Sequence, residues 1–411
     1  MKKALLCMVC FIACFPMVMT AQEGETNPVQ SAPVFYRDYT VMVGGFGDIG
    51  NAVHNSRTTS KLMFDCYYRF IAPGIDSQFL RECLGAVWSF TTTWFSTMAS
   101  HEFGHFFRAN EVGATFWIEA LGFPGPRGNI LFSDNKTKED ELNFVTGGIE
   151  VNTLFAMGVQ EDWYRHNGLY NDELFVTVFH KIVFPAYAFS VDAANPNNWR
   201  DDNQNEIALG DVASTARLVF ERQGKAVVLP DGTVNPELVS YYSWTQWASL
   251  LTLLLDFNTY SEVSALFSGE TNGKKAPWLF GDSTWGYSYG IFSSISQLGT
   301  DIYLHNYLAL NKQSLLVYLR YGFPLKNYGM GITVRDITIA NSLAMDVSAH
   351  LWTQEYCSFG GAIEGTIFIN FTPNWALAVL GRWKSPGYML GLPLCEGLSL
   401  MVGIRYTTTS E

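Results

Sequence analysis

Residues 98–109 have the sequence MASHEFGHFFRA, which places two histidines four residues apart with a glutamate directly after the first. On an α-helix, His101 and His105 lie one turn apart on the same face. Two imidazoles so placed can bind one zinc ion, and the neighbouring Glu102 is left free to move protons. Because the chain has only 7 histidines in 411 residues, a chance match is rare. The sequence therefore predicts a zinc-binding helix with a hydrolytic centre.

A zinc ion that hydrolyses an amide needs three protein ligands and one open position, so one ligand must come from another segment. Glu150 is the first candidate, because it is the only charged residue in the segment 142–160. A carboxylate in such an apolar segment is costly to bury unless it is paired or bound to a metal. Asp256, which follows the apolar run 250–255, is the alternative.

Four apolar segments are expected to be helices packed around the zinc-binding helix. The runs 83–100 and 238–255 carry no charge, and each is about long enough to cross a hydrocarbon layer. Segments 144–159 and 174–191 are interrupted by charges and are expected to be core helices. The glycine pair at 147–148 allows another helix to approach closely.

The N-terminus has the composition of a secretory signal. Two lysines at positions 2 and 3 precede an apolar stretch at 4–19, and a small residue, Ala21, precedes a polar segment. We expect cleavage after Ala21 and export to the cell envelope, and the composition favours the outer membrane of a Gram-negative bacterium.

The overall composition excludes one class of partner and favours another. With 26 basic and 38 acidic residues the formal net charge is −12, so the chain lacks the basic footprint of a nucleic-acid-binding protein. Charged residues make up 16% of the chain, against roughly a quarter in typical soluble domains. We therefore expect a lipid membrane as a partner and no nucleic acid.

From about residue 301 onward, runs of roughly ten residues alternate between apolar and polar side chains and are separated by Gly, Pro and Asn. This pattern predicts antiparallel strands with two different faces. Such strands, with Tyr and Trp near their ends, fit an outer-membrane β-barrel or a soluble antiparallel sheet, and the segment 39–45 is a further strand candidate. The predicted strands are 315–323, 328–336, 343–351, 361–371, 375–383 and 398–407.

Residues 95–156 resemble the membrane-embedded site-two-type metalloproteases. The resemblance is carried by MASHEFGHFFRA at 98–109, by EVGA at 111–114 with LGFPGP at 121–126, and by GIEVN at 148–152. It implies that Asn152 contributes to the active site by orienting the substrate or the oxyanion. The family's final metal ligand is an aspartate within a segment containing Asn, Pro and Asp-Gly, which has no match in this chain.

The expected fold class is a membrane-associated α+β protein in three parts. A signal peptide at 1–21 precedes a mainly helical zinc-metallopeptidase-like region at 22–300, and an antiparallel β-rich region, with a barrel as one possible form, follows at 301–411.

The expected function is zinc-dependent hydrolysis of peptide bonds in a protein or peptide substrate. His101, His105 and Glu150 are expected to bind Zn²⁺, Glu102 to act as general base on the zinc-bound water, and Asn152 to assist catalysis. A competing interpretation is an outer-membrane β-barrel or scaffold protein whose HExxH motif is structural or inactive. A zinc hydrolase acting on another type of bond is the third.

Overall fold

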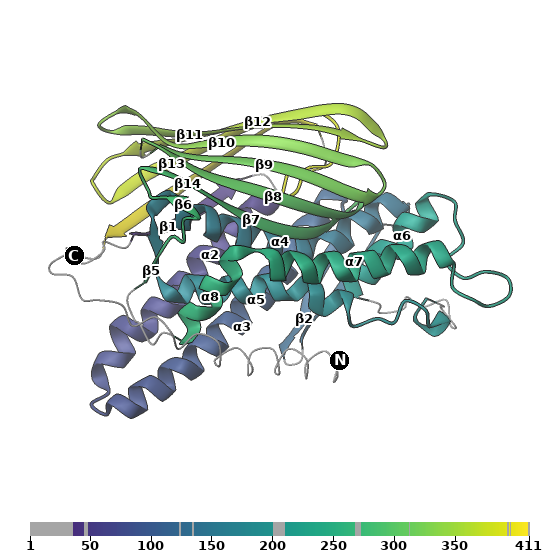
Figure 1. Ribbon diagram of the computed structural model, residues 1–411, viewed down its shortest axis with the longest axis horizontal. Coiled ribbons are helices and arrows are strands. Elements are labelled where there is room, and N and C mark those ends of the chain that lie inside the picture. Colours follow the sequence, from purple (N-terminus) through teal and green to yellow (C-terminus); the bar gives the residue numbers. More distant parts are fainter. Residues whose placement is uncertain are drawn as a thin grey trace.

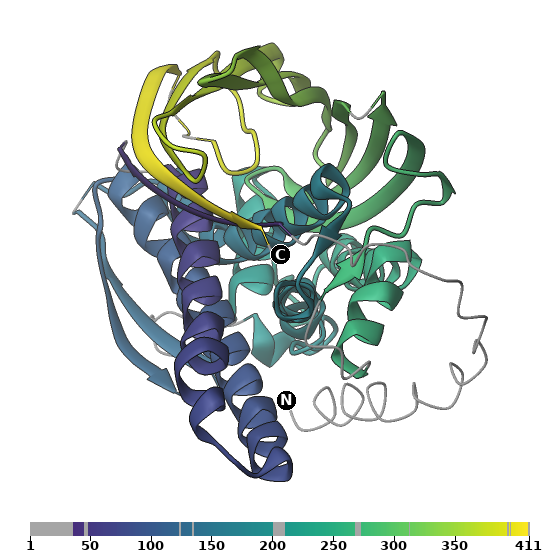
Figure 2. The same ribbon diagram turned by 90° about the vertical axis from the view of Figure 1, so that its left-hand side faces the viewer.

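The computed structural model describes residues 36–44, 48–122, 125–133, 135–199, 210–267, 273–311, 313–392, 394 and 396–409. It consists of a helical bundle covered on one side by a large antiparallel sheet (Figure 1). Seen from the end, the strands form an arc whose concave side faces the helices (Figure 2). The expected α+β class, with helices followed by a β-rich part, is confirmed. The expected signal peptide, 1–21, lies outside the described residues.

The four apolar segments that were expected to be helical lie within α3, α4, α5 and α7, and only α5 ends earlier than expected, at Ala188. Helix α4 is central, because it contacts α2, α3, α5 and α6 as well as strands of the sheet. The helices are α2 (Ile49–Asp65), α3 (Gln78–Glu111), α4 (Lys138–His166), α5 (Asn171–Ala188), α6 (Gly210–Arg222), α7 (Pro236–Leu255) and α8 (Phe257–Phe267).

Helix α4 has a defined cap at each end. At its N-terminus, the Thr137 hydroxyl accepts from the Asp140 backbone N–H, and the Asp140 carboxylate accepts from the Thr137 N–H. This capping box satisfies two backbone donors that the helix leaves unpaired. At the C-terminus, Asn167 adopts the left-handed conformation, with φ of 55°, which ends the helix.

Helices α3 and α4 cross at a pair of glycines. A Cβ atom on Gly104 would lie 2.1 Å from the Gly147 carbonyl oxygen, and one on Gly147 would lie 2.5 Å from the Gly104 carbonyl oxygen. No side chain fits between the two backbones, so both positions require glycine. The close approach expected from the glycine pair at 147–148 is confirmed, and it brings α4 against the HExxH helix.

All six strands predicted in the C-terminal part are present, with ends that differ from the prediction by a few residues. The sheet has ten strands in the order β1-β14-β13-β12-β11-β10-β9-β8-β7-β6. Its strands are β1 (Tyr36–Gly44), β6 (Phe280–Gly281), β7 (Trp285–Ser296), β8 (Gly299–Leu310), β9 (Gln313–Pro324), β10 (Asn327–Ala340), β11 (Leu343–Gln354), β12 (Cys357–Asn370), β13 (Trp375–Lys384) and β14 (Gly397–Thr409).

The sheet is not confined to residues 301–411. Strands β6 and β7 precede residue 301, and β1 from the N-terminal part pairs antiparallel with β14, so the strand expected within 39–45 is confirmed. In the described part of the chain, strand pairing ends at β1 and β6, which do not pair with each other. The sheet is therefore open, and a closed ring of strands is not formed among these residues.

Two further pairs of strands lie outside the large sheet. Strands β2 (Thr115–Gly122) and β3 (Gly125–Leu131) form a separate hairpin directly after α3. The short strands β4 (Gly168–Leu169) and β5 (Lys274–Lys275) join the end of α4 to the segment before the sheet.

Among the helices that the structure describes, none combines the length and the apolar character needed to cross a membrane. The runs 83–100 and 238–255 therefore have about the length of a membrane span but not its apolar character. Both runs are uncharged, but they contain several Ser, Thr, Tyr and Trp residues, so they are less apolar than the lack of charge suggests.

Candidate metal centre

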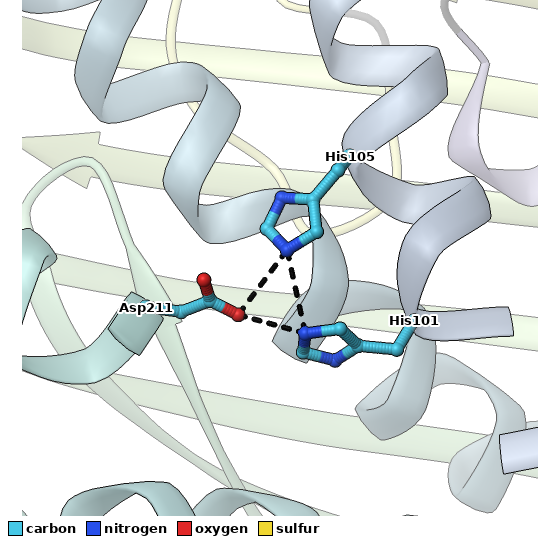
Figure 3. A group of neighbouring side chains, drawn as sticks. All are labelled: His101, His105 and Asp211. Atoms are coloured by element: carbon cyan, nitrogen blue, oxygen red, sulfur yellow. Dashed lines mark hydrogen bonds and ion pairs between the residues drawn. The ribbon is translucent and has the colours of Figure 1, made fainter. Parts of the chain in front are cut away.

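Two imidazoles and one carboxylate meet between α3 and α6 (Figure 3). His101 and His105 lie on one face of α3, and Asp211 lies in the first turn of α6. The Asp211 Oδ2 atom is 2.9 Å from His101 Nε2 and 3.2 Å from His105 Nε2, and the two Nε2 atoms are 3.3 Å apart. Among the described residues, these three form the one group of His, Cys, Asp or Glu side chains arranged to hold a metal ion.

Hydrogen bonds on the far side of each ring fix which imidazole nitrogen carries the proton. The His105 Nδ1 atom lies 2.9 Å from the Phe144 carbonyl oxygen, so it must be a donor. The His101 Nδ1 atom lies 2.8 Å from Asn152 Oδ1. The Asn152 amide is oriented by its Nδ2 atom, which donates to the Thr97 carbonyl oxygen at 3.4 Å, so His101 Nδ1 is also a donor.

In the neutral rings, both Nε2 atoms therefore present lone pairs toward Asp211. The Asp211 Oδ2 atom is buried and has no hydrogen-bond partner of acceptable geometry among the described residues. With both rings neutral, three acceptor atoms would converge with no hydrogen between them, which is a costly arrangement. A cation is therefore required at this point, either a proton on a ring, as the raised pKa of His105 indicates in the absence of a metal, or a metal ion.

The spacing of the three atoms fits zinc. A tetrahedral zinc ion with bonds of about 2.0–2.2 Å holds its ligand atoms about 3.3–3.6 Å apart. The observed separations of 2.9, 3.2 and 3.3 Å are slightly shorter, and a point about 1 Å above their plane lies about 2.1 Å from each atom. Three ligands leave the fourth tetrahedral position open, as in catalytic rather than structural zinc sites.

Gly148 on α4 forms the floor of this site. A Cβ atom on Gly148 would lie 2.5 Å from His101 Nε2 and 2.6 Å from His105 Nε2. Any side chain here would therefore press against both rings at their Nε2 edges. Glycine is the residue that lets the two imidazoles lie this close to α4 and to each other.

Glu102 lies beside the cluster and is buried. Its Oε2 atom faces the backbone of β3, since a Cβ atom on Gly128 would lie 2.7 Å from it. Burial raises the pKa of the Glu102 carboxyl, and the charges on His105 and His101 oppose this rise. A raised pKa suits a carboxylate that accepts and returns a proton near neutral pH.

In the absence of a metal, the pKa values of His105 and Asp211 depend strongly on each other. Burial lowers the pKa of His105, but the Asp211 carboxylate more than offsets this and raises that pKa to about 9. Burial raises the pKa of Asp211, and the two imidazoles hold it well below its usual range. Asp211 is thus a permanent anion, as a metal ligand must be.

Tyr187 on α5 borders the same space. Its ring centroid lies 5.3 Å from that of His101. Burial raises the pKa of its hydroxyl, and the Asp211 and Glu102 charges raise it further, so the hydroxyl stays protonated beside both carboxylates.

The expected third ligand, Glu150, lies elsewhere. Its carboxylate is fully buried but is paired with Arg108, whose Nε and Nη2 atoms are 2.8 and 2.7 Å from Glu150 Oε2, and it accepts from the Tyr388 hydroxyl. The Glu150 carboxylate does have a buried partner, as expected. That partner is the Arg108 guanidinium rather than a metal ion.

The alternative ligand, Asp256, is also engaged in an ion pair. Lys181 Nζ lies 2.5 Å from Asp256 Oδ2 and 2.6 Å from Glu262 Oε2, and all three side chains are buried. Neither carboxylate belongs to the group formed by the two histidines.

Asn152 lies next to the site, but its side chain contacts His101 rather than the open position. Its Oδ1 atom accepts from His101 Nδ1, and its Nδ2 atom lies 2.9 Å from His180 Nδ1. Asn152 therefore holds the His101 ring in place, and a role in orienting the substrate or the oxyanion stays a prediction from the family resemblance. The His180 Nε2 atom is buried without a hydrogen-bond partner in the described part of the chain.

Asp211 is the residue that sequence reasoning missed. It follows a polar segment, at the start of a helix, where acidic residues are common because they stabilise helix N-termini. The one available signal was the glycine before it, which has φ of 70° and marks the entry to α6.

Comparisons of the chain with models of protein families, with curated proteins and with solved structures found no match.

Proposed function

We propose that this protein is a zinc-dependent metallopeptidase in which His101, His105 and Asp211 bind the metal. The observation that carries the proposal is the convergence of two Nε2 lone pairs and one buried carboxylate oxygen within 3.3 Å of one another. Hydrogen bonds to Phe144 and Asn152 hold the rings in the tautomer that metal binding requires.

Bound zinc supplies a Lewis acid that polarises the scissile carbonyl and lowers the pKa of a coordinated water to about 7. Glu102 accepts a proton from the attacking water and returns it to the leaving amine nitrogen. The raised pKa of its carboxyl favours that second step. Its position on the helix, directly after His101, keeps its carboxylate beside the metal without making it a ligand.

A peptide is the favoured substrate because a free strand edge lies beside the catalytic glutamate. Strands β2 and β3 form a hairpin that pairs with no further strand among the described residues. Glu102 Oε2 lies against Gly128 of β3. An extended peptide can add to such an edge through backbone hydrogen bonds, which would bring its carbonyl groups close to Glu102.

The test compares Glu102→Gln with Glu119→Gln, which alters an exposed carboxylate on β2 of the same hairpin region. Cleavage of denatured casein and of a mixture of fluorogenic peptides is measured, together with zinc content. We expect Glu102→Gln to keep its zinc and to lose hydrolysis by about 10²-fold or more, since general-base catalysis contributes about 10²–10⁴-fold. Glu119→Gln should retain both.

Equal hydrolysis by wild type and Glu102→Gln would contradict the proposal. If neither protein cleaves any peptide while both bind zinc, the competing interpretation of a structural or inactive metal motif would gain support. Export and localisation in the cell envelope stay predictions from the N-terminal composition.

A further inference from the structure

The outward face of the ten-stranded sheet is apolar, and the charged side chains of β11–β14 lie on the inward face. Along β13 the side chains alternate strictly: Trp375 and Trp383 are exposed, and Arg382 and Lys384 are buried. Outward positions on β11–β14 carry no charged residue. Exposed apolar side chains on this face include Leu319, Ile332, Ile363, Ile367, Leu400 and Ile404.

The inward face holds several ion pairs beside buried apolar clusters, one of which contains Met42, Phe368, Leu380 and Met401. Arg335 Nε lies 2.7 Å from Glu161 Oε1 on α4, and Arg335 Nη1 lies 3.3 Å from Asp346 Oδ2 on β11. Arg382 pairs with Glu364 on the neighbouring strand and with Asp48 before α2. These groups border a cavity of about 260 Å³ between the sheet and helices α2 and α4.

The outward face differs from that of a sheet whose outer face is in water, where polar side chains point outward. Individual exposed apolar residues are common on protein surfaces, but a continuous apolar face over many strands marks contact with a membrane or with another protein. Leu398 is 82% exposed and Leu400 60%, so the described part of the chain leaves this face uncovered at these positions.

We propose that the outward face of the sheet contacts the acyl chains of a lipid bilayer. The face is convex, because the strands curve around the helices (Figure 2). A second copy of a rigid convex surface can touch it only along a narrow line, whereas fluid acyl chains can cover every strand. The absence of charge at the outward positions of β11–β14 also leaves no complementary group for a charged protein partner.

Aromatic side chains lie at the two ends of the apolar face. Trp383 marks one end of β13 and Trp375 the other, where it packs against Tyr406 at 4.6 Å between ring centroids. The two tryptophans are eight residues apart on one strand, which corresponds to about 26 Å. Lipid-facing strands typically have an apolar band about 25 Å tall between girdles of aromatic residues.

Spin labels at outward positions test this contact. A nitroxide is attached at Leu400→Cys in one variant and at Ile367→Cys in another. Each is a full-length chain whose native cysteines are replaced by serine and whose zinc content matches wild type. Asp231→Cys, at an exposed loop position, is the matched control. Collision rates with oxygen and with a neutral nickel chelate are measured in vesicles of phosphatidylcholine and phosphatidylglycerol.

We expect oxygen to exceed the chelate on the order of tenfold at Leu400 and Ile367, because the polar chelate is excluded from hydrocarbon, and the reverse at Asp231. Higher access to the chelate at Leu400 and Ile367 would place the face in water and overturn the proposal. Low access to both reagents, with spin–spin broadening, would indicate contact with a second copy and also overturn it.

A charge on the face gives a second test. Val402→Arg should lose flotation with the same vesicles, whereas Asp231→Arg should float as wild type does. Val402→Arg with normal zinc content and normal flotation would contradict the proposal. These results do not depend on hydrolysis, so the proposed peptidase activity and the lipid contact can fail separately.

Discussion

Replacing Gly148 by alanine should remove zinc binding while leaving the helices folded. The added methyl carbon would lie 2.5 Å from His101 Nε2 and 2.6 Å from His105 Nε2, whereas ordinary van der Waals contact begins at about 3.4 Å. Both rings would have to retreat by about 0.8–0.9 Å, and metal sites tolerate ligand displacements of only about 0.2 Å.

The size of the effect follows from these distances. Loss of an outer hydrogen bond to a metal ligand typically weakens metal binding by about 10–100-fold. Displacing two ligating rings at once should therefore cost more than about 100-fold in zinc affinity. Overpacking costs about 1–3 kcal/mol of stability, and the better helix propensity of alanine offsets up to about 1 kcal/mol of this, so the variant should fold.

The assay is competition with a chelator of known zinc affinity, combined with melting curves with and without the chelator. Metal removal should lower the melting temperature of wild type but not that of Gly148→Ala, because only wild type gains stability from bound zinc. Gly158→Ala on the same helix is the control, since its methyl would meet Arg57 Nη1 at 3.0 Å, at the end of a long side chain and away from the two histidines. Wild-type zinc affinity in Gly148→Ala would show that the ion does not lie where we place it.

The remaining predictions concern the groups around the metal centre. Asn152→Leu should weaken zinc binding by about 10–100-fold, measured by chelator competition, because it removes the acceptor that fixes the His101 ring; unchanged affinity would contradict this positioning role. Zinc affinity should rise with pH until about 9 and then level off, since the metal-free His105 holds a proton below that pH and must lose it to bind zinc; a flat profile between pH 6 and 9 would contradict it. Glu150→Gln should lower stability by about 1.5–3 kcal/mol, seen as a lower melting temperature, because it removes one of the two carboxylates that pair with the buried Arg108 guanidinium and leaves Glu111 as the other.

The parts of the structure that could be predicted are those encoded by local patterns. The alternation of outward and inward side chains along β13 is visible in the sequence and recurs as a strand with nearly the expected ends. The pairing of His101 with His105 likewise depends only on the four-residue period of one helix. Pairing between β1 and β14 could not be predicted, because these strands are separated by most of the chain and no local signal joins them.

The third ligand shows where sequence reasoning failed. Burial of Glu150 was correctly inferred from its apolar context, but that context does not name the partner. The partner, Arg108, lies one turn beyond His105 in the very helix that binds the metal, so an ion pair was available there. Asp211 carries no such signal, since an acidic residue in the first turn of a helix is ordinary. Only the three-dimensional approach of α6 to α3 identifies it.

The zinc content of purified Asp211→Ala, measured beside wild type and Glu150→Gln, separates the observed cluster from the ligand set expected from the sequence. We predict about one zinc ion per chain in wild type and in Glu150→Gln, and nearly none in Asp211→Ala, because two imidazoles alone do not complete the site. A full complement of zinc in Asp211→Ala, or its loss in folded Glu150→Gln, would contradict the assignment of His101, His105 and Asp211 as the metal ligands.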